Sequence, residues 1–330
     1  MKNVISTAMV LTGTFIGAGF ASGQEIMQYF GVFGKFGIVG VLISCILLGA
    51  FTYCTADNIS CLGEKSYVEQ ICKFRCVNWL FNCYMLLIFC TMITAFGESL
   101  NQAFDFPKIY GVILIDAVTI IILYFGADGL IKLNSAVTPL IILGIVFVFC
   151  IKNTTEVFSY NNFVSSGIIY TSYNVISLPF VMIGIKNILS SKKNIMLCTT
   201  VFCGIIFVLA LCILCILKGV DTTSAIPLLN AVSEDYTLMF IFLLAMAMLT
   251  TAVSNGYGFI NAVGINKNVS LVFLFVFSLL FSLFSFGFIV RYLYSFFGYM
   301  GLYILLTNFN IFLKNREKPR KIKKIYNNYK

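Results

Sequence analysis

The stretch LTGTFIGAGFASGQEI, residues 11–26, decides the fold of this chain. Within an otherwise apolar segment it holds the carboxylate of Glu25 and four glycines: Gly13, Gly17, Gly19 and Gly23. A glycine in a helix interior costs about 1 kcal/mol relative to alanine. Four of them in eleven residues predict that a helix formed here is interrupted.

The rest of the chain has the composition of a helical membrane protein. Its 330 residues are 60% hydrophobic and 11% charged, and the mean hydropathy is +0.96. Apolar runs of about 20 residues recur along the whole length, which is the length needed to cross a bilayer. The expected fold class is therefore an all-α polytopic membrane protein. The chain has twelve cysteines and no histidine, and most of the cysteines lie in apolar runs. There they pack as small hydrophobes, so neither a metal centre nor disulfides are predicted.

The hydropathy pattern predicts ten transmembrane helices without an inserted soluble domain. The ten segments are Val4–Phe30, Phe36–Ala56, Trp79–Phe104, Ile109–Phe125, Asn134–Ile151, Phe163–Ile185, Ile195–Leu217, Tyr236–Val263, Val269–Phe288 and Tyr292–Phe312.

The distribution of basic residues predicts the orientation. With the N-terminus in the cytoplasm, seventeen lysines and arginines lie on the cytoplasmic side and five on the other. This is a strong positive-inside bias, and it places both termini in the cytoplasm. The basic tail, residues 314–330, is interpreted as a cytoplasmic anchor, with binding to anionic lipid headgroups as the alternative. Nothing else in the sequence supports nucleic-acid binding.

The span count predicts an inverted repeat. Residues 1–156 and 157–313 each hold five predicted spans, and an odd number makes the two halves enter the membrane from opposite sides. Such repeats are expected to carry an interrupted helix at matching positions. In span six, Pro179 follows a cluster of hydrogen-bonding residues, and proline removes a backbone donor and clashes with the preceding turn. Spans one and six are therefore predicted to be broken.

The two breaks predict a solute site. An unwound Gly17–Ala18–Gly19 would expose N–H groups near the membrane midplane, which suits a carboxylate. Side chains of span six would complete the site, and the candidates are Ser172, Tyr173 and Asn174. The alternative is that the glycines of span one only allow close helix packing, because they recur at four-residue spacing.

Span eight offers oxygen ligands for a cation. Ala247, Thr250, Thr251 and Ser254 share one helical face. Neighbouring hydroxyls and a carbonyl suit a small alkali cation if carbonyls of span one complete the shell. The alternative is that these hydroxyls only bond within their own helix or to a neighbouring helix.

Gly13-x3-Gly17-Ala18-Gly19 resembles the broken-helix motif G-x3-G-x-G of the amino acid–polyamine–organocation superfamily and of other LeuT-fold transporters. The longer stretch GTFIGAGFASGQEI is similar to the signature of the YkvI-like bacterial membrane proteins of that superfamily. The resemblance implies a LeuT-like fold of five plus five helices in a bacterial cell membrane. It also implies a sodium site made by Gly13, Ile16, Ala247, Thr250 and Thr251. Phe20 stands where related folds have an ion-binding Asn, so a second sodium site is not expected.

Four ionisable residues are candidates for gating or coupling, because charges are expensive to bury in a membrane. They are Glu25, Glu98, Asp116 and Arg291. Glu25 and Arg291 could close the outer mouth as an ion pair, and any of the three acids could carry a coupling proton. The alternatives are that Asp116 bonds a neighbouring helix, Arg291 reaches lipid headgroups, and Glu25 binds a substrate amine or caps local amides.

The sequence therefore predicts a sodium symporter: a secondary active transporter of a small amino acid or related amine-bearing solute. Proton coupling, or a ligand-sensing receptor of the same fold, are the alternatives. An enzyme is not expected, because no catalytic constellation can be assembled. The predicted partners are the solute and the lipid bilayer; no cofactor is expected besides the sodium ion, and the oligomeric state is left open.

Overall fold

The computed structural model describes residues 2–151, 163–184, 192–218, 220, 227–284 and 296–316. Helices make up the regular structure of these residues, and no strand occurs among them. In chain order the elements are α1 (Lys2–Phe15), α2 (Ala18–Ala21), α3 (Gln24–Tyr29), η1 (Gly31–Phe36), α4 (Gly37–Leu62), α5 (Glu64–Ile71), α6 (Arg75–Phe104), α7 (Lys108–Tyr124), α8 (Gly126–Ile151), α9 (Phe163–Asn174), α10 (Leu178–Gly184), α11 (Lys192–Ile216), α12 (Pro227–Ala231), η3 (Glu234–Tyr236), α13 (Thr237–Val263), α14 (Lys267–Phe281) and a last helix, Phe296–Arg316.

Six of the described helices are long and apolar enough to cross a membrane: α4, α6, α8, α11, α13 and the last helix. The pair α9 and α10, bent by 41° at its break, would count as a seventh span. Helices of this length and composition show a multi-pass membrane protein. The count of ten stays a prediction, because several of the predicted spans are short, broken or only partly described.

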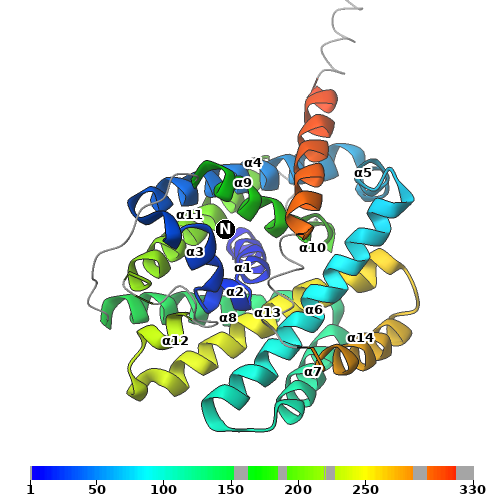
Figure 1. The fold of residues 1–330 in the computed structure, drawn as a ribbon. Coiled ribbons are helices and arrows are strands. Elements are labelled where there is room, and N and C mark those ends of the chain that lie inside the picture. Colours follow the sequence, from blue (N-terminus) through cyan, green and yellow to red (C-terminus); the bar gives the residue numbers. More distant parts are fainter. Residues whose placement is uncertain are drawn as a thin grey trace, which may run out of the picture.

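Helix α1 lies in the middle of the molecule (Figure 1) and packs against α8, α11 and α13. On one side α6, α7, α13 and α14 contact one another, and on the other α4 packs between α9 and α11. The most apolar 18-residue windows of α6 and α13 are 72% buried, whereas that of α8 is 33% buried. The contact of α6 with α13 is thus part of the interior, and α8 turns most of its apolar surface outward.

Two helices are longer than the spans predicted from hydropathy. Helix α8 begins at Gly126, eight residues before the predicted Asn134, and α4 continues to Leu62, six residues past the predicted Ala56. The added turns of α8 include Asp128 and Lys132. Hydropathy indicates where a helix is apolar enough to lie in lipid, whereas the helix itself continues as long as its backbone bonds are favourable.

The first span is broken twice, not once. Helix α1 ends at Phe15, and Gly17 is extended, with φ −88° and ψ −173°. The second break follows α2, where Gly23 has φ +78°, a conformation that favours glycine. Leu228 of α12 covers this second break, because its N–H donates to the Ser22 carbonyl at 2.9 Å.

The sixth predicted span is broken where its proline indicates. Helix α9 ends at Asn174 and α10 begins at Leu178, so Pro179 lies in the first turn of the second segment. A proline ring there would clash with the carbonyl four residues back if the helix were continuous. Val175, at that position, lies outside both helices.

A buried polar network attaches the last helix to α4 and α5. The Asn308 side chain accepts hydrogen bonds from Asn58 and Tyr67, both at 3.0 Å, and donates to Thr55 Oγ1 at 2.9 Å. All four side chains are fully buried. Because the alternative for each group is an unsatisfied polar atom in an apolar interior, the network determines where the last helix packs.

The last helix also approaches the break of the sixth span at Gly301. A β-carbon added at Gly301 would overlap the Ser172 carbonyl and lie 3.0 Å from the Tyr173 nitrogen. Backbone atoms cannot move aside as a flexible side chain can, so only glycine fits at this contact.

We therefore expect Gly301→Ala to destabilise the protein by about 1–3 kcal/mol, the usual cost of overpacking. The matched control is Gly204→Ala, on α11, where an added β-carbon meets nothing within 4 Å. Thermal unfolding of the purified protein in detergent measures both. Equal unfolding midpoints for the two variants would contradict this packing.

Candidate functional site

The break of the first span meets α13 at Thr251. The Thr251 hydroxyl donates to the Ile16 carbonyl at 2.9 Å and also lies 3.2 Å from the Gly13 carbonyl. Carbonyls at the end of a helix have no partner within that helix, so an outside donor must satisfy them. The predicted ion ligands Gly13, Ile16 and Thr251 are therefore brought together.

The other two predicted ion ligands form a pair on α13. The Thr250 hydroxyl donates to the Ala247 carbonyl at 3.0 Å, within its own helix. Thr250 and Thr251 are both buried, at 0% and 4% exposure. One turn further along, Thr14 of α1 donates to Ser254 at 2.9 Å, which extends the contact of the two helices.

These groups are neutral oxygen ligands in a buried place. Carbonyl and hydroxyl oxygens suit hard cations, and neutral ligands suit a monovalent ion because no excess negative charge is buried. Among the residues that the structure describes, no group of three His, Cys, Asp or Glu could hold a metal ion. The sodium site stays a prediction; the Thr251 hydroxyl is within hydrogen-bond distance of two of its predicted ligands, the Gly13 and Ile16 carbonyls.

The glycines of the first span have different neighbours. A β-carbon at Gly13 would overlap the Asn134 amide oxygen of α8, so this glycine allows close helix packing, as the alternative interpretation expects. At Gly17 the nearest atom would be 3.5 Å away, on Thr251, which is ordinary contact. At Gly19 an added β-carbon would overlap the carboxyl group of Glu25.

The amides at the break differ from the predicted carboxylate cradle. The Gly17 N–H donates to the Phe15 carbonyl at 3.0 Å. The Ala18 N–H points to the Met92 sulfur of α6, at 3.3 Å. The carboxyl group of Glu25 fills the space beside Gly19. Two of the three predicted amides thus have partners within the protein, and the third lies beside a carboxyl group of the chain itself.

The predicted solute ligands of the sixth span bond mostly within their own helix. Ser172 donates to the Ile168 carbonyl at 2.7 Å, and Asn174 donates to the Tyr170 carbonyl at 2.9 Å. Tyr173 differs, because its ring packs against Tyr29 of α3. The solute site built from Ser172, Tyr173 and Asn174 stays a prediction.

Four tyrosines gather where the two broken spans meet, and we call them the tyrosine cluster: Tyr29, Tyr84, Tyr170 and Tyr173. The rings of Tyr29, Tyr170 and Tyr173 lie 5.4–5.7 Å apart between centroids. The Tyr84 hydroxyl of α6 donates to the Tyr173 carbonyl at 2.9 Å. Sequence reasoning found only Tyr173. The spacing of Glu25 and Tyr29, four residues apart on one helix face, was a signal for a second member.

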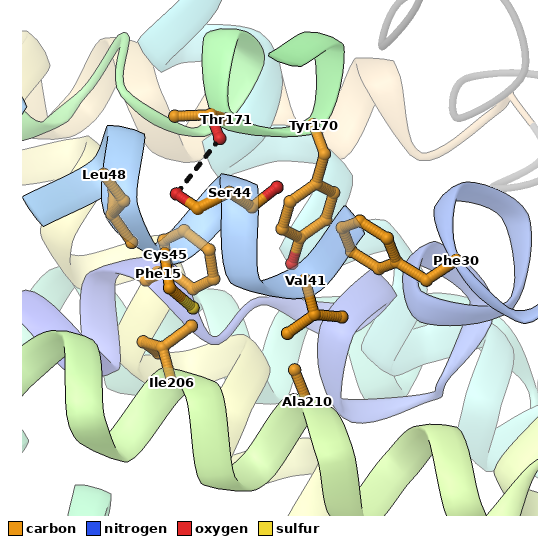
Figure 2. Close-up of a pocket in the computed structure, with 10 residues that line it drawn as sticks. All are labelled: Phe15, Phe30, Val41, Ser44, Cys45, Leu48, Tyr170, Thr171, Ile206 and Ala210. Atoms are coloured by element: carbon orange, nitrogen blue, oxygen red, sulfur yellow. Dashed lines mark hydrogen bonds between the residues drawn. The ribbon is translucent and has the colours of Figure 1, made fainter. Parts of the chain in front are cut away.

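A small cavity lies next to this cluster, between α1, α4, α9 and α11 (Figure 2). Its volume is about 10 Å³, enough for about one water molecule, and Phe15, Val41, Tyr170 and Ile206 are among its mainly apolar lining. The Thr171 hydroxyl lies 3.3 Å from the Ser44 carbonyl at its edge. None of the six predicted solute ligands lines this cavity.

The remaining ionisable candidates are distributed over separate places. Glu98 forms an ion pair with Lys108 at 3.4 Å, and both side chains are partly exposed. Asp116 is buried and accepts a hydrogen bond from Ser278 of α14, which matches the alternative of a bond between helices. Arg291 lies outside the described residues, and so does the proposed pair of Glu25 with it. Glu25 is buried at the break, with 5% of its surface exposed.

Comparisons with known proteins find relatives among bacterial membrane proteins. No protein-family profile matches the chain. It is 24% identical over 320 residues to the uncharacterized protein YyaD of Bacillus subtilis (strain 168), covering 90% of this chain and 94% of YyaD. It is 27% identical over 209 residues to the uncharacterized membrane protein YkvI of the same organism, covering 57% of this chain and 58% of YkvI.

The fold is similar to that of solved membrane transporters. A Na⁺-coupled sialic acid symporter in a substrate-bound state aligns with a TM-score of 0.62 at 12% identity, over 94% of this chain and 78% of its own. A manganese transporter of Eremococcus coleocola aligns with a TM-score of 0.57 at 11% identity, over 95% of this chain and 75% of the transporter. The nucleobase-cation-symport-1 family transporter Mhp1 aligns with a TM-score of 0.53 at 12% identity, over 84% of this chain and 70% of Mhp1. All three are transporters and none is an enzyme; at this identity the likeness shows the fold.

The contact of Gly19 with Glu25 leads to a prediction on stability. We expect Gly19→Ala to lower the unfolding midpoint, because the new methyl group would displace a buried carboxyl group. The matched control Gly17→Ala fits its surroundings and should have a much smaller effect.

A double-mutant cycle with Glu25→Ala tests whether the two positions are coupled. Removing the Glu25 side chain makes room for the methyl group, so Gly19→Ala should cost less in that background, by about 0.5–3 kcal/mol. Additive changes in the free energy of unfolding would mean that Gly19 is required for another reason.

Proposed function

We propose that this protein is a secondary active transporter of a small amino acid or related amine-bearing solute, coupled to sodium. The observation that carries this proposal is the Thr251 hydroxyl on the Ile16 and Gly13 carbonyls, at 2.9 and 3.2 Å. A broken helix whose freed carbonyls face neutral hydroxyls of a second helix is the arrangement expected of an alkali-cation site in an alternating-access transporter. Transporters with this fold support the general class.

We further propose ten spans arranged as an inverted repeat of LeuT-like topology, with halves at 1–156 and 157–313. Helices at matching positions of the two halves contact each other: α4 with α11, α6 with α13, and α7 with α14. The broken spans match in the same way, since α1 contacts α10. These pairs are expected where two repeats of opposite orientation pack around a common axis.

In this proposal the protein lies in the bacterial cell membrane with both termini in the cytoplasm. The basic tail, 314–330, begins within the last helix, which ends at Arg316. Seventeen cytoplasmic basic residues against five on the outer side support that orientation.

The site suggests how ion and solute binding are coupled. The Thr251 hydroxyl satisfies the Ile16 and Gly13 carbonyls as a hydrogen-bond donor. A cation bound to the carbonyls would replace this hydrogen bond. The hydroxyl would then rotate, so that its oxygen lone pair faces the ion. Binding of the ion therefore stabilises the break between α1 and α2 in one arrangement. Next to that break lie Gly19 and Glu25, so the ion and a solute would favour the same conformation.

We expect the double variant Thr250→Val, Thr251→Val to lose the sodium dependence of uptake, because it keeps the side-chain shape and deletes two oxygen ligands. The measurement is uptake of an amino acid and amine panel by reconstituted protein, with sodium and proton gradients imposed separately. The matched control is Thr119→Val on α7, a buried threonine whose hydroxyl bonds only the Ile115 carbonyl of its own helix at 2.7 Å.

Uptake that follows the proton gradient alone would contradict sodium coupling. Solute binding without accumulation in any gradient would contradict transport, and would favour a receptor. An undiminished sodium dependence in the double variant would mean that the ion binds elsewhere.

A further inference from the structure

We propose that the Glu25 carboxylate and the tyrosine cluster bind the ammonium group of the solute, and that the solute is a cationic amine without a carboxylate. This inference rests on the proposed transport function and names the substrate class of that same site.

Glu25 is a buried acid. Only 5% of the residue is exposed, and its Oε2 has no hydrogen-bond partner among the residues that the structure describes. A carboxylate in a low-dielectric interior is expensive unless a positive group or hydrogen-bond donors accompany it. A buried acid with an unused oxygen at the break of a transport helix therefore indicates a place for a cationic partner.

Within the described ranges, the single ion pair joins Glu98 to Lys108, and no lysine or arginine pairs with Glu25. Two phenols from other helices lie close to Glu25: Tyr173 of α9 lies against the carboxyl group, and Tyr84 of α6 is close enough to interact with its charge. Phenols donate hydrogen bonds but carry no positive charge, so among these neighbours a cationic ligand would be the group that pairs with the carboxylate.

The tyrosine cluster has the chemistry to bind an ammonium group. The face of an aromatic ring attracts an ammonium group, and several such faces around one carboxylate form a common recognition site for amines. The rings of Tyr29, Tyr170 and Tyr173 are within 5.7 Å of one another, from both broken spans. Ser166 of α9 also donates to the Tyr29 carbonyl at 2.6 Å, which ties the two spans together at this point.

The same site is unfavourable for a substrate carboxylate. The amides that were expected to hold a substrate carboxylate are those of residues 17–19. The carboxyl group of Glu25 lies beside Gly19, which has no side chain that would displace it. A substrate carboxylate at the same amides would be repelled by Glu25 at short distance. The site therefore favours a simple amine over a zwitterionic amino acid.

The test compares four probes with three carbon atoms each: propylamine, propanol, propionate and alanine. Binding to the purified full-length protein is measured by calorimetry in the presence of sodium, at concentrations up to the millimolar range. We expect propylamine to bind and its neutral and anionic analogues to bind at least about tenfold more weakly, since a charge-assisted contact is worth more than a factor of ten.

Glu25→Gln should lower the affinity for propylamine by about tenfold or more, because it removes the charge and keeps the shape. The matched control is Glu69→Gln, which removes one carboxylate from the exposed surface of α5. Should Glu25→Gln fail to fold, as judged by thermal unfolding, Glu25→Asp retracts the charge by one methylene and is expected to weaken amine binding by an intermediate factor. Tyr29→Leu removes a ring face without touching the carboxylate, and should also weaken it.

Four results would overturn this inference. The first three are the absence of amine binding by the wild-type protein, equal amine affinity in Glu25→Gln, and tighter binding of alanine than of propylamine. Recovery of amine binding in Glu25→Gln when Arg291→Gln is added would also overturn it, since it would assign Glu25 to an ion pair.

The two proposals fail separately. Binding of propylamine that depends on Glu25, without accumulation in any gradient, leaves the amine site intact and removes the transport function. Sodium-driven uptake of another solute that is unchanged in Glu25→Gln leaves transport intact and removes the amine site.

Discussion

The structure depends on how the carbonyls at the end of α1 are satisfied. A helix that stops inside an apolar bundle leaves polar backbone groups without partners, and each such group is costly there. Here the Thr251 hydroxyl is the hydrogen-bond donor for the Gly13 and Ile16 carbonyls. On the other side of the break, the Ala18 N–H points to the Met92 sulfur. The break is therefore held between α13 and α6, the two helices that form the interior. This explains why α1 occupies the middle of the fold: its exposed backbone is stable only where other helices surround it.

Much of this fold could be predicted from the sequence because hydropathy and glycine or proline positions are local signals. The apolar runs predict the long helices, Pro179 predicts the break of the sixth span, and the glycines around residue 17 predict that of the first. The second break at Gly23 was missed, since it depends on Leu228 of α12, more than two hundred residues away, donating to the Ser22 carbonyl. Of the site, the family resemblance marked Thr251 as an ion ligand; its hydroxyl lies on the Gly13 and Ile16 carbonyls, and the ion site stays a prediction.

What could not be predicted involves contacts between distant segments whose residue types are common. The network of Asn58, Tyr67 and Asn308 joins three helices through ordinary polar side chains, and no local spacing marks them as partners. Glu98 was expected to be a candidate for coupling, but its ion pair with Lys108 depends on the turn between α6 and α7. Likewise Gly19 and Gly23 have a helix-packing spacing in the sequence, and the place of the Glu25 carboxyl group beside Gly19 appears only in the folded structure, where the second break intervenes.

The two breaks of the first span give it a particular mechanical property. Residues 18–21 form a short helix between the two breaks, with the Ile16 carbonyl at one end and Glu25 beyond the other. A group bound at either end restrains the same short segment, so the entropy lost in ordering it is shared by the two binding events. An ion at the carbonyls and a cation at Glu25 are also held apart by this segment, which limits their mutual repulsion. A continuous helix would connect these positions rigidly and could not respond to either ligand. Of the residues at the two breaks, Gly23 needs to be glycine for its backbone conformation, with φ +78°, whereas Gly17 is extended. In the proposed mechanism the two breaks let one short segment of backbone respond to both sites.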